Sequence, residues 1–130
     1  LSVVSLLLGA KESVAVDIDP NCIDTAYENA DMNGVPRDKY HVIAGNVVTD
    51  PDVQEYISKN KYEVVAANIV ADVIIGLAPK AREYMKEGGV FITSGIIDGR
   101  QEDVKAALIE NGFTIESMSR RKDWWSIVCR

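Results

Sequence analysis

Residues 13–20, Ser13-Val14-Ala15-Val16-Asp17-Ile18-Asp19-Pro20, decide the fold of this chain. Their first part is small and β-branched, as is typical of a buried strand. The strand then ends in carboxylates, at Asp17 and Asp19. In nucleotide-binding α/β proteins an acidic residue ending the second strand takes the ribose hydroxyls. We therefore interpret residues 13–17 as the second strand of such a unit.

Strand-like runs alternate with helical patterns along the rest of the chain, which favours a mainly parallel sheet covered by helices. The predicted fold is α/β, a doubly wound and mainly parallel sheet that ends in an antiparallel strand pair. The predicted strands are 13–17, 40–44, 62–67, 90–94, 113–119 and 124–129, and the predicted helices are 1–10, 21–32, 51–58, 70–86 and 98–111.

Composition restricts the class of protein. The chain has 130 residues, 47% of them hydrophobic, and a formal net charge of −6. This predicts one domain over residues 1–130, without a direct nucleic-acid surface and with a modest preference for a basic partner. No apolar run approaches a membrane span, so we expect a cytoplasmic protein. Cys22 and Cys129 match no metal spacing and are predicted to be free thiols, and no metal site is expected.

Four motifs then occur in a characteristic order. They are the acidic strand end at 16–20, Gly45-Asn46 after a strand, the run 68–72 (Asn-Ile-Val-Ala-Asp), and Lys86-Glu87-Gly88-Gly89 before an apolar strand. Their order and spacing resemble a class I S-adenosylmethionine-dependent methyltransferase, a Rossmann-like fold. The stretch 68–75, the Ser-Gly-Ile-Ile run at 94–97 and Trp124 resemble the bacterial ribosomal-protein methyltransferases that modify the eleventh protein of the large subunit.

The resemblance implies S-adenosyl-L-methionine as cofactor and a role for four residues. Asp17 is expected to accept hydrogen bonds from the ribose hydroxyls, and Ile18 to pack against the adenine. Asn46 is expected to hold the adenine amino group. Asn68, the predicted catalytic residue, is expected to hold the methionyl part or to orient the target nitrogen.

Each of these residues also has a structural interpretation. Asp17 could cap a turn with Asp19, Asn46 could occupy a left-handed turn after Gly45, and Asn68 could be a helix N-cap. His41 is interpreted as part of the scaffold.

Two features near the C-terminus are also open to alternatives. Trp124 and Trp125 point to opposite faces of a strand, so we expect one in the core and the other at the lip of a substrate cleft. Residues 120–122 are interpreted as a solvated turn, with binding of ribosomal RNA or of a cofactor carboxylate as the alternatives.

The resemblance further predicts that the chain is an N-terminally truncated catalytic domain, without the first, central strand and its glycine-rich loop. Three ways to close the resulting gap are expected: the flanking strands 13–17 and 62–67 pair, a second copy supplies strands in a homo-oligomer, or a cleaved piece stays bound. Since the loop contacts the cofactor, the fragment itself is expected to bind it weakly and to be inactive.

The predicted function is therefore S-adenosylmethionine-dependent methylation of lysine and N-terminal amines on a basic large-subunit ribosomal protein. The alternatives are a methyltransferase for a small molecule or a glutamine amide, an NAD-dependent oxidoreductase, since an acidic strand end also suits NAD, and a noncatalytic binding module.

Overall fold

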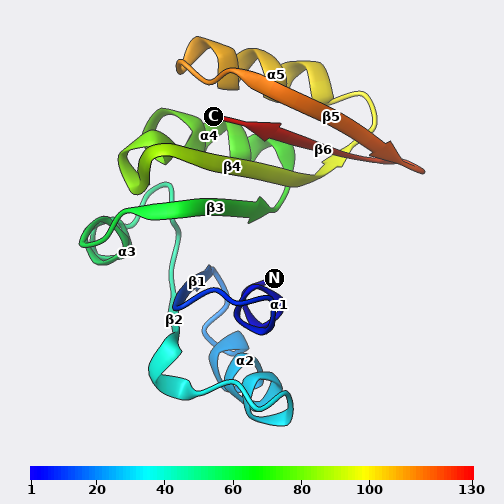
Figure 1. Ribbon diagram of the computed structural model, residues 1–130. Helices are drawn as coiled ribbons and strands as arrows, with labels where there is room; N and C mark the ends of the chain where they lie inside the picture. Colours follow the sequence, from blue (N-terminus) through cyan, green and yellow to red (C-terminus); the bar gives the residue numbers. More distant parts are fainter. The chain divides into compact units, whose positions relative to one another are not determined.

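The computed structural model describes residues 1–130, which fall into two compact units, residues 1–57 and residues 58–130. Their strands form two sheets, one in each unit (Figure 1). Strands 13–17 and 62–67 belong to different sheets, so the first of the three predicted ways to close the gap, direct pairing of these strands, is wrong. Each unit is described by itself below.

The first unit has a parallel pair of strands with helices. Asp17 lies opposite Ala44 in this pair, so both strands end at the same edge. The predicted strands 13–17 and 40–44 and the predicted helix 51–58 are confirmed. The elements are α1 (Ser2–Leu7), β1 (Ser13–Asp17), α2 (Cys22–Met32), the 3₁₀ turn η1 (Arg37–Lys39), β2 (Tyr40–Ala44) and α3 (Pro51–Ser58).

A small core attaches α2 to β2. Ala30, Val35 and Tyr40 are buried there, and the Tyr27 ring packs edge-on against the Tyr40 ring with centroids 5.7 Å apart. The Tyr27 hydroxyl accepts a hydrogen bond from the backbone amide of Val42 at 3.2 Å. Tyr27 therefore gives α2 both an apolar and a polar contact with the strand.

The second unit is a four-stranded sheet in the order β3-β4-β6-β5, with β3 and β4 parallel and the other neighbours antiparallel. The predicted antiparallel pair at the C-terminus is confirmed. The elements are β3 (Tyr62–Asn68), α4 (Ala71–Ala81), the 3₁₀ turn η2 (Arg82–Tyr84), β4 (Met85–Ile97), α5 (Gln101–Glu110), β5 (Ile115–Arg121) and β6 (Trp124–Cys129).

The core of the second unit lies between its sheet and the helices α4 and α5. Phe91 of β4, Ile74 of α4, Leu108 of α5 and Ile127 of β6 are fully buried, and the Phe91 and Phe113 rings pack with centroids 5.4 Å apart. Both helices and the central strands of the sheet thus contribute buried apolar side chains, which fix the sheet on which the candidate site is built.

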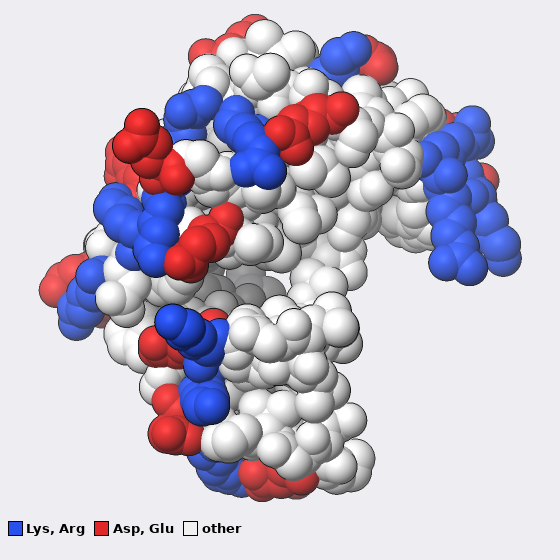
Figure 2. Space-filling view, viewed as in Figure 1, with Lys and Arg blue, Asp and Glu red and all other residues white.

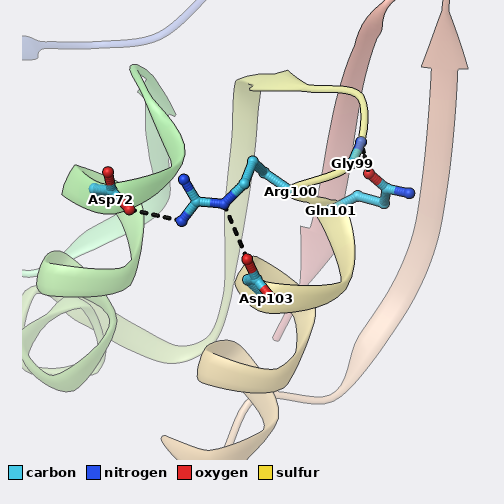
Figure 3. A network of polar contacts seen from close by, with 5 residues as sticks. All are labelled: Asp72, Gly99, Arg100, Gln101 and Asp103. Atoms are coloured by element: carbon cyan, nitrogen blue, oxygen red, sulfur yellow. Dashed lines mark hydrogen bonds and ion pairs between the residues drawn. The ribbon is translucent and has the colours of Figure 1, made fainter.

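Arg100 connects the two helices of this unit (Figure 3). It lies just before α5, and its guanidinium donates to Asp103 at 2.9 Å and to Asp72 in the first turn of α4 at 2.6 Å. The guanidinium lowers the pKa of the Asp72 carboxyl by hydrogen bonding and by its charge. One side chain therefore links the N-terminal ends of α4 and α5.

The predicted helix 70–86 is wrong at its C-terminal end. The helix α4 ends at Ala81, and after a 3₁₀ turn that buries Tyr84 the strand β4 begins at Met85 instead of residue 90. Met85 lies opposite Tyr62 and Val90 opposite Val64, so the glycine-containing run 86–89 forms an irregular bulge inside a strand. The apolar spacing of the sequence fits a helix up to residue 86 and gives no sign that the strand already begins at Met85.

Several further boundaries differ from the prediction. The helix α1 ends at Leu7 rather than at residue 10, β4 ends at Ile97 rather than at residue 94, and β5 begins at Ile115 rather than at residue 113. The helix α5 begins at Gln101 rather than at residue 98, because Gly99 is in the left-handed region at φ 94°. The predicted turn 120–122 overlaps β5, which continues to Arg121 opposite Trp124, so only Lys122 and Asp123 connect the two strands. Lys122 has a φ of 57° and makes this tight connection possible.

Candidate functional site

The carboxyl ends of β1 and β2 bring three predicted site residues together. Asp17 ends β1, Ile18 follows it with 71% of its surface exposed, and Gly45-Asn46 follows β2. The Gly45 amide donates to the Asp17 carbonyl oxygen at 2.8 Å, which holds the two strand ends side by side. A carboxylate, a bare aliphatic side chain and an amide therefore share one edge of the first unit.

Asp17 has the structural role that its alternative interpretation describes. Its Oδ1 accepts a hydrogen bond from the Asp19 amide at 3.0 Å. A carboxylate has two oxygens with about four acceptor sites, so this bond leaves capacity for ribose hydroxyls. The structural and the cofactor-binding interpretations of Asp17 are compatible.

The exit turn of β2 depends on Gly45 and Asn46 in different ways. Gly45 is the residue with positive φ, at 151°, and a Cβ atom there would lie 2.4 Å from Cγ2 of Val53 on α3. The expected left-handed turn at Asn46 is therefore wrong. Asn46 instead accepts hydrogen bonds at Oδ1 from the amides of Val48 (2.9 Å) and Thr49 (3.3 Å). Its role toward adenine stays a prediction.

Cys22 lies beside this edge, a neighbour that the sequence did not identify as part of the site. Its pKa is raised by burial, by the negative charges of Asp17 and Asp19 and by a hydrogen bond with Asp17. The raised pKa favours the protonated thiol over the thiolate at this edge.

In the second unit a cavity of about 760 Å³ opens where β3 ends. Three segments line it: 68–70 at the end of β3, 94–95 in β4, and 119–121 with 124–126 in the β5–β6 hairpin. Asn68, the predicted catalytic residue, is thus a wall of this cavity. It lies in a different unit from Asp17, Ile18 and Asn46.

Asn68 is placed by a close contact with Gly95. Gly95 has a φ of 79° and lies in an irregularity of β4, and a Cβ atom there would lie 2.9 Å from Asn68 Oδ1 and 2.9 Å from the Ile69 carbonyl oxygen. The interpretation of Asn68 as a helix N-cap is wrong, because the N-cap of α4 is Val70 and it makes no side-chain capping bond. The Asn68 amide therefore does not cap α4.

The two tryptophans both line the cavity, and the expectation that one is in the core is wrong. Trp124 is 52% exposed and Trp125 is half-buried. The Trp125 Nε1–H donates to Asp98 Oδ1 at 2.8 Å, which satisfies the indole outside the core. The prediction of a tryptophan at the lip of a cleft agrees with the exposure of Trp124.

The hairpin beside the tryptophans carries positive charge. Figure 2 shows Lys and Arg side chains gathered at its tip, where Arg120, Arg121 and Lys122 are consecutive. Arg120 is fixed by Asp98 Oδ2 at 2.8 Å and by the Lys122 carbonyl oxygen at 2.8 Å, so it is a structural part of the hairpin.

Three further observations concern the single histidine, metal binding and membrane spans. His41 Nε2 lies 3.1 Å from Glu12 Oε1, and His41 is opposite Val14 near the start of the strand pair, whereas Asp17 lies at its end. No group of three or more His, Cys, Asp or Glu side chains is arranged to hold a metal ion. No helix is both long enough and apolar enough to span a bilayer.

A family model described as "Ribosomal protein L11 methyltransferase (PrmA)" matches residues 1–130. The chain belongs to this family. A ribosomal protein L11 methyltransferase from Lachnoclostridium phytofermentans is 40% identical over 143 residues, which cover 100% of this chain and 43% of the relative. One from Heliobacterium modesticaldum is 42% identical over 130 residues, covering 100% and 39%. The chain thus spans about two-fifths of the length of these L11 methyltransferases.

Solved structures agree with the family and the fold. The ribosomal protein L11 methylase of Lactobacillus delbrueckii subsp. bulgaricus superposes with a TM-score of 0.86 at 28% identity, over 99% of this chain and 62% of that one. Aeropyrum pernix fibrillarin, solved with bound S-adenosyl-L-methionine, superposes with a TM-score of 0.71 at 13% identity, over 92% and 55%. The predicted class I methyltransferase fold of this L11 methyltransferase family member is confirmed.

Sequence reasoning missed Gly95 and Asp98 as parts of the site. Both lie in or next to the Ser-Gly-Ile-Ile run, which the resemblance already singled out without assigning a role to its residues. Their importance comes from contacts with segments far along the chain, at Asn68 and Trp125. Pattern spacing carries no information on such contacts.

Proposed function

We propose that the protein that carries this chain is a cytoplasmic, S-adenosyl-L-methionine-dependent N-methyltransferase that modifies amines of ribosomal protein L11. The acceptors are lysine side chains and the N-terminal amine, and residues 1–130 belong to one methyltransferase domain. The observation that carries the proposal is the match of the L11 methyltransferase family model to every residue of the chain.

The edge of the first unit suits the adenosine part of the cofactor. Asp17 is exposed and keeps acceptor capacity for ribose hydroxyls, and the exposed Ile18 offers an apolar surface for a planar base. We assign Asn46 to the adenine amino group. Its Oδ1 already accepts hydrogen bonds from the amides of Val48 and Thr49, so it would accept the adenine hydrogen as a further bond. Bound S-adenosyl-L-methionine supplies an already activated methyl group.

The cavity of the second unit suits the acceptor amine. Asn68 carries an amide oxygen that can accept a hydrogen from an amine and orient its lone pair, and Trp124 contributes an apolar wall that excludes water. Orientation and desolvation are the main contributions that such a transfer needs from side chains. The net charge of −6 also favours encounter with a basic ribosomal protein.

The test is methyl transfer to purified L11 by the protein that carries this chain, measured by mass spectrometry of L11. We expect methylated lysines and a methylated N-terminus. Asn68→Ala should lower kcat by about 100-fold, because misplacing the amine costs this much in an oriented reaction. Asn60→Ala, the same change at an exposed residue before β3, is the control and should keep the activity.

Two outcomes contradict the proposal. Absence of transfer to L11 with S-adenosyl-L-methionine present refutes the assigned function. Equal kcat for the Asn68 and Asn60 variants refutes the assigned role of Asn68.

A further inference from the structure

Asp98 makes three hydrogen bonds to the hairpin that walls the cavity. Its Oδ1 accepts from Trp125 Nε1 at 2.8 Å, its Oδ2 accepts from Arg120 at 2.8 Å, and its backbone amide donates to the Asp123 carbonyl oxygen at 2.8 Å. Asp98 lies just after β4, and the hairpin is formed by β5 and β6. One residue thus attaches both strands of the hairpin and its turn to the end of β4.

The Asp98 carboxylate also determines how the side chains of Arg120 and Trp125 lie relative to each other. The Arg120 guanidinium lies 5.9 Å from the centroid of the Trp125 ring while both groups bond to Asp98. Charge-assisted hydrogen bonds are shorter and stronger than neutral ones. The carboxylate therefore holds the ring and the guanidinium in one arrangement.

This arrangement reaches Trp124 through the backbone. Asp123, whose carbonyl oxygen accepts the Asp98 amide, directly precedes Trp124, so Asp98 holds the backbone on which both tryptophans lie. Trp124 lines the cavity with Asn68 and is 52% exposed, so its own packing does not hold it. A wall that is mobile before binding must be ordered on binding, at an entropic cost.

We propose that Asp98 is a positioning residue that preorganises the Trp124–Trp125 wall of the cavity for the acceptor. The inference rests on the proposed function for its link to the acceptor. It predicts that loss of the carboxylate weakens use of the acceptor and leaves the handling of the methyl donor unchanged. Asp98 touches neither reactant in this assignment, so it is not a catalytic residue.

The first measurement uses this chain alone and does not depend on activity. In ¹H–¹⁵N spectra the Nε1–H resonance of Trp125, assigned with Trp125→Phe, is expected to move and to lose protection against exchange in Asp98→Ala. Asp98→Asn keeps an oxygen acceptor and should give an intermediate effect. Asp123→Asn is the control, because it also removes a carboxylate from this hairpin. Asp123 contacts Asp98 through its backbone carbonyl oxygen and not through its side chain, so this variant should leave the Trp125 resonance in place.

The second measurement is steady-state methyl transfer by the protein that carries this chain. Asp98→Ala should raise KM for the acceptor by about tenfold, in line with a lost charged hydrogen bond, with kcat and donor KM near wild type. Asp98→Asn should recover part of the loss, and Asp123→Asn should match wild type.

The outcomes separate this inference from the proposed function. An unchanged Trp125 resonance in a folded Asp98→Ala chain overturns the positioning role, whether or not L11 is methylated. A shifted resonance with unchanged acceptor KM also overturns it, since Asp98 is then a structural residue of the hairpin. No transfer by the wild-type protein refutes the proposed function, and the spectra then still decide whether Asp98 holds the indole.

Discussion

Gly95 shows how much the candidate site depends on a single missing side chain. Its φ of 79° is in the region that favours glycine, and the backbone there approaches Asn68 and Ile69 closely. Gly95→Ala should lower the free energy of unfolding by about 1–3 kcal/mol beyond the backbone cost, because two oxygens would lie 2.9 Å from the new methyl group. Chemical denaturation of the chain measures this.

Gly99→Ala is the matched control for this change. Gly99 has a φ of 94°, also positive, but a Cβ atom there would meet no atom within 4 Å. We expect about 1 kcal/mol of destabilisation from the backbone alone. Equal losses for the two variants would show that the contact with Asn68 has no energetic weight.

At the residue scale the sequence predicted position better than role. Asp17 and Asn68 were found because a polar residue after a buried strand is visible as a pattern, and both lie where strands end. The alternative roles were less predictable. The need for glycine at position 45 comes from the close approach of Val53 on α3, which no spacing in the sequence reveals.

At the scale of secondary-structure elements, the ion pair between Arg100 and Asp72 connects the N-terminal ends of α4 and α5. Arg100 lowers the pKa of Asp72 below its usual value, so the charged form of Asp72 stabilises the fold. A depressed carboxyl pKa contributes stability above the usual pKa and loses it as the pH falls through the folded value. Arg100→Gln should therefore raise the Asp72 pKa toward its usual value and weaken the loss of stability in acid.

A carboxyl titration by NMR and unfolding curves at neutral and acid pH measure both effects. Both groups are exposed, so the effect on stability should be small and should shrink in salt. Lys105→Gln is the control, because Lys105 pairs with Glu102 inside α5 and connects no two helices. If the two variants lose the same free energy of unfolding at every pH, the ion pair between α4 and α5 stabilises the fold no more than a pair within one helix does.

Most elements could be predicted from periodicity, since their apolar positions are regular and their ends carry glycine, proline or asparagine. The errors occur where tertiary contacts override the local signal. The 3₁₀ turn after α4 is fixed by the burial of Tyr84, and the start of β4 by its pairing with Tyr62. The hairpin needs a left-handed Lys122, which sequence preference argues against.

At the scale of the whole molecule the two units differ in how much they bury. The largest fully buried side chains, among them Phe91, Ile96 and Ile127, all belong to the second unit. The first unit has a two-stranded sheet, and such pairs are marginal without further support. Hydrogen exchange should therefore show amide protection in β4 and β6 about 10- to 100-fold above that in β1 and β2.

Exchange detected by mass spectrometry on the chain is the measurement. Exchange of all strands at one common rate would contradict the prediction and indicate that residues 1–57 and 58–130 open together. Tyr27→Phe provides an internal check, since it leaves the Val42 amide without its hydroxyl partner and should raise exchange in the first unit alone.

The Tyr27 hydroxyl also affects how copies of this chain behave at high concentration. A strand with a free edge is a template for strands of other molecules, and this is one route to aggregation. The strand β2 has one strand neighbour, and its Val42 amide donates to Tyr27 instead of to a strand. A side chain from α2 thus occupies a position that an incoming strand needs, which guards β2 against edge-to-edge aggregation.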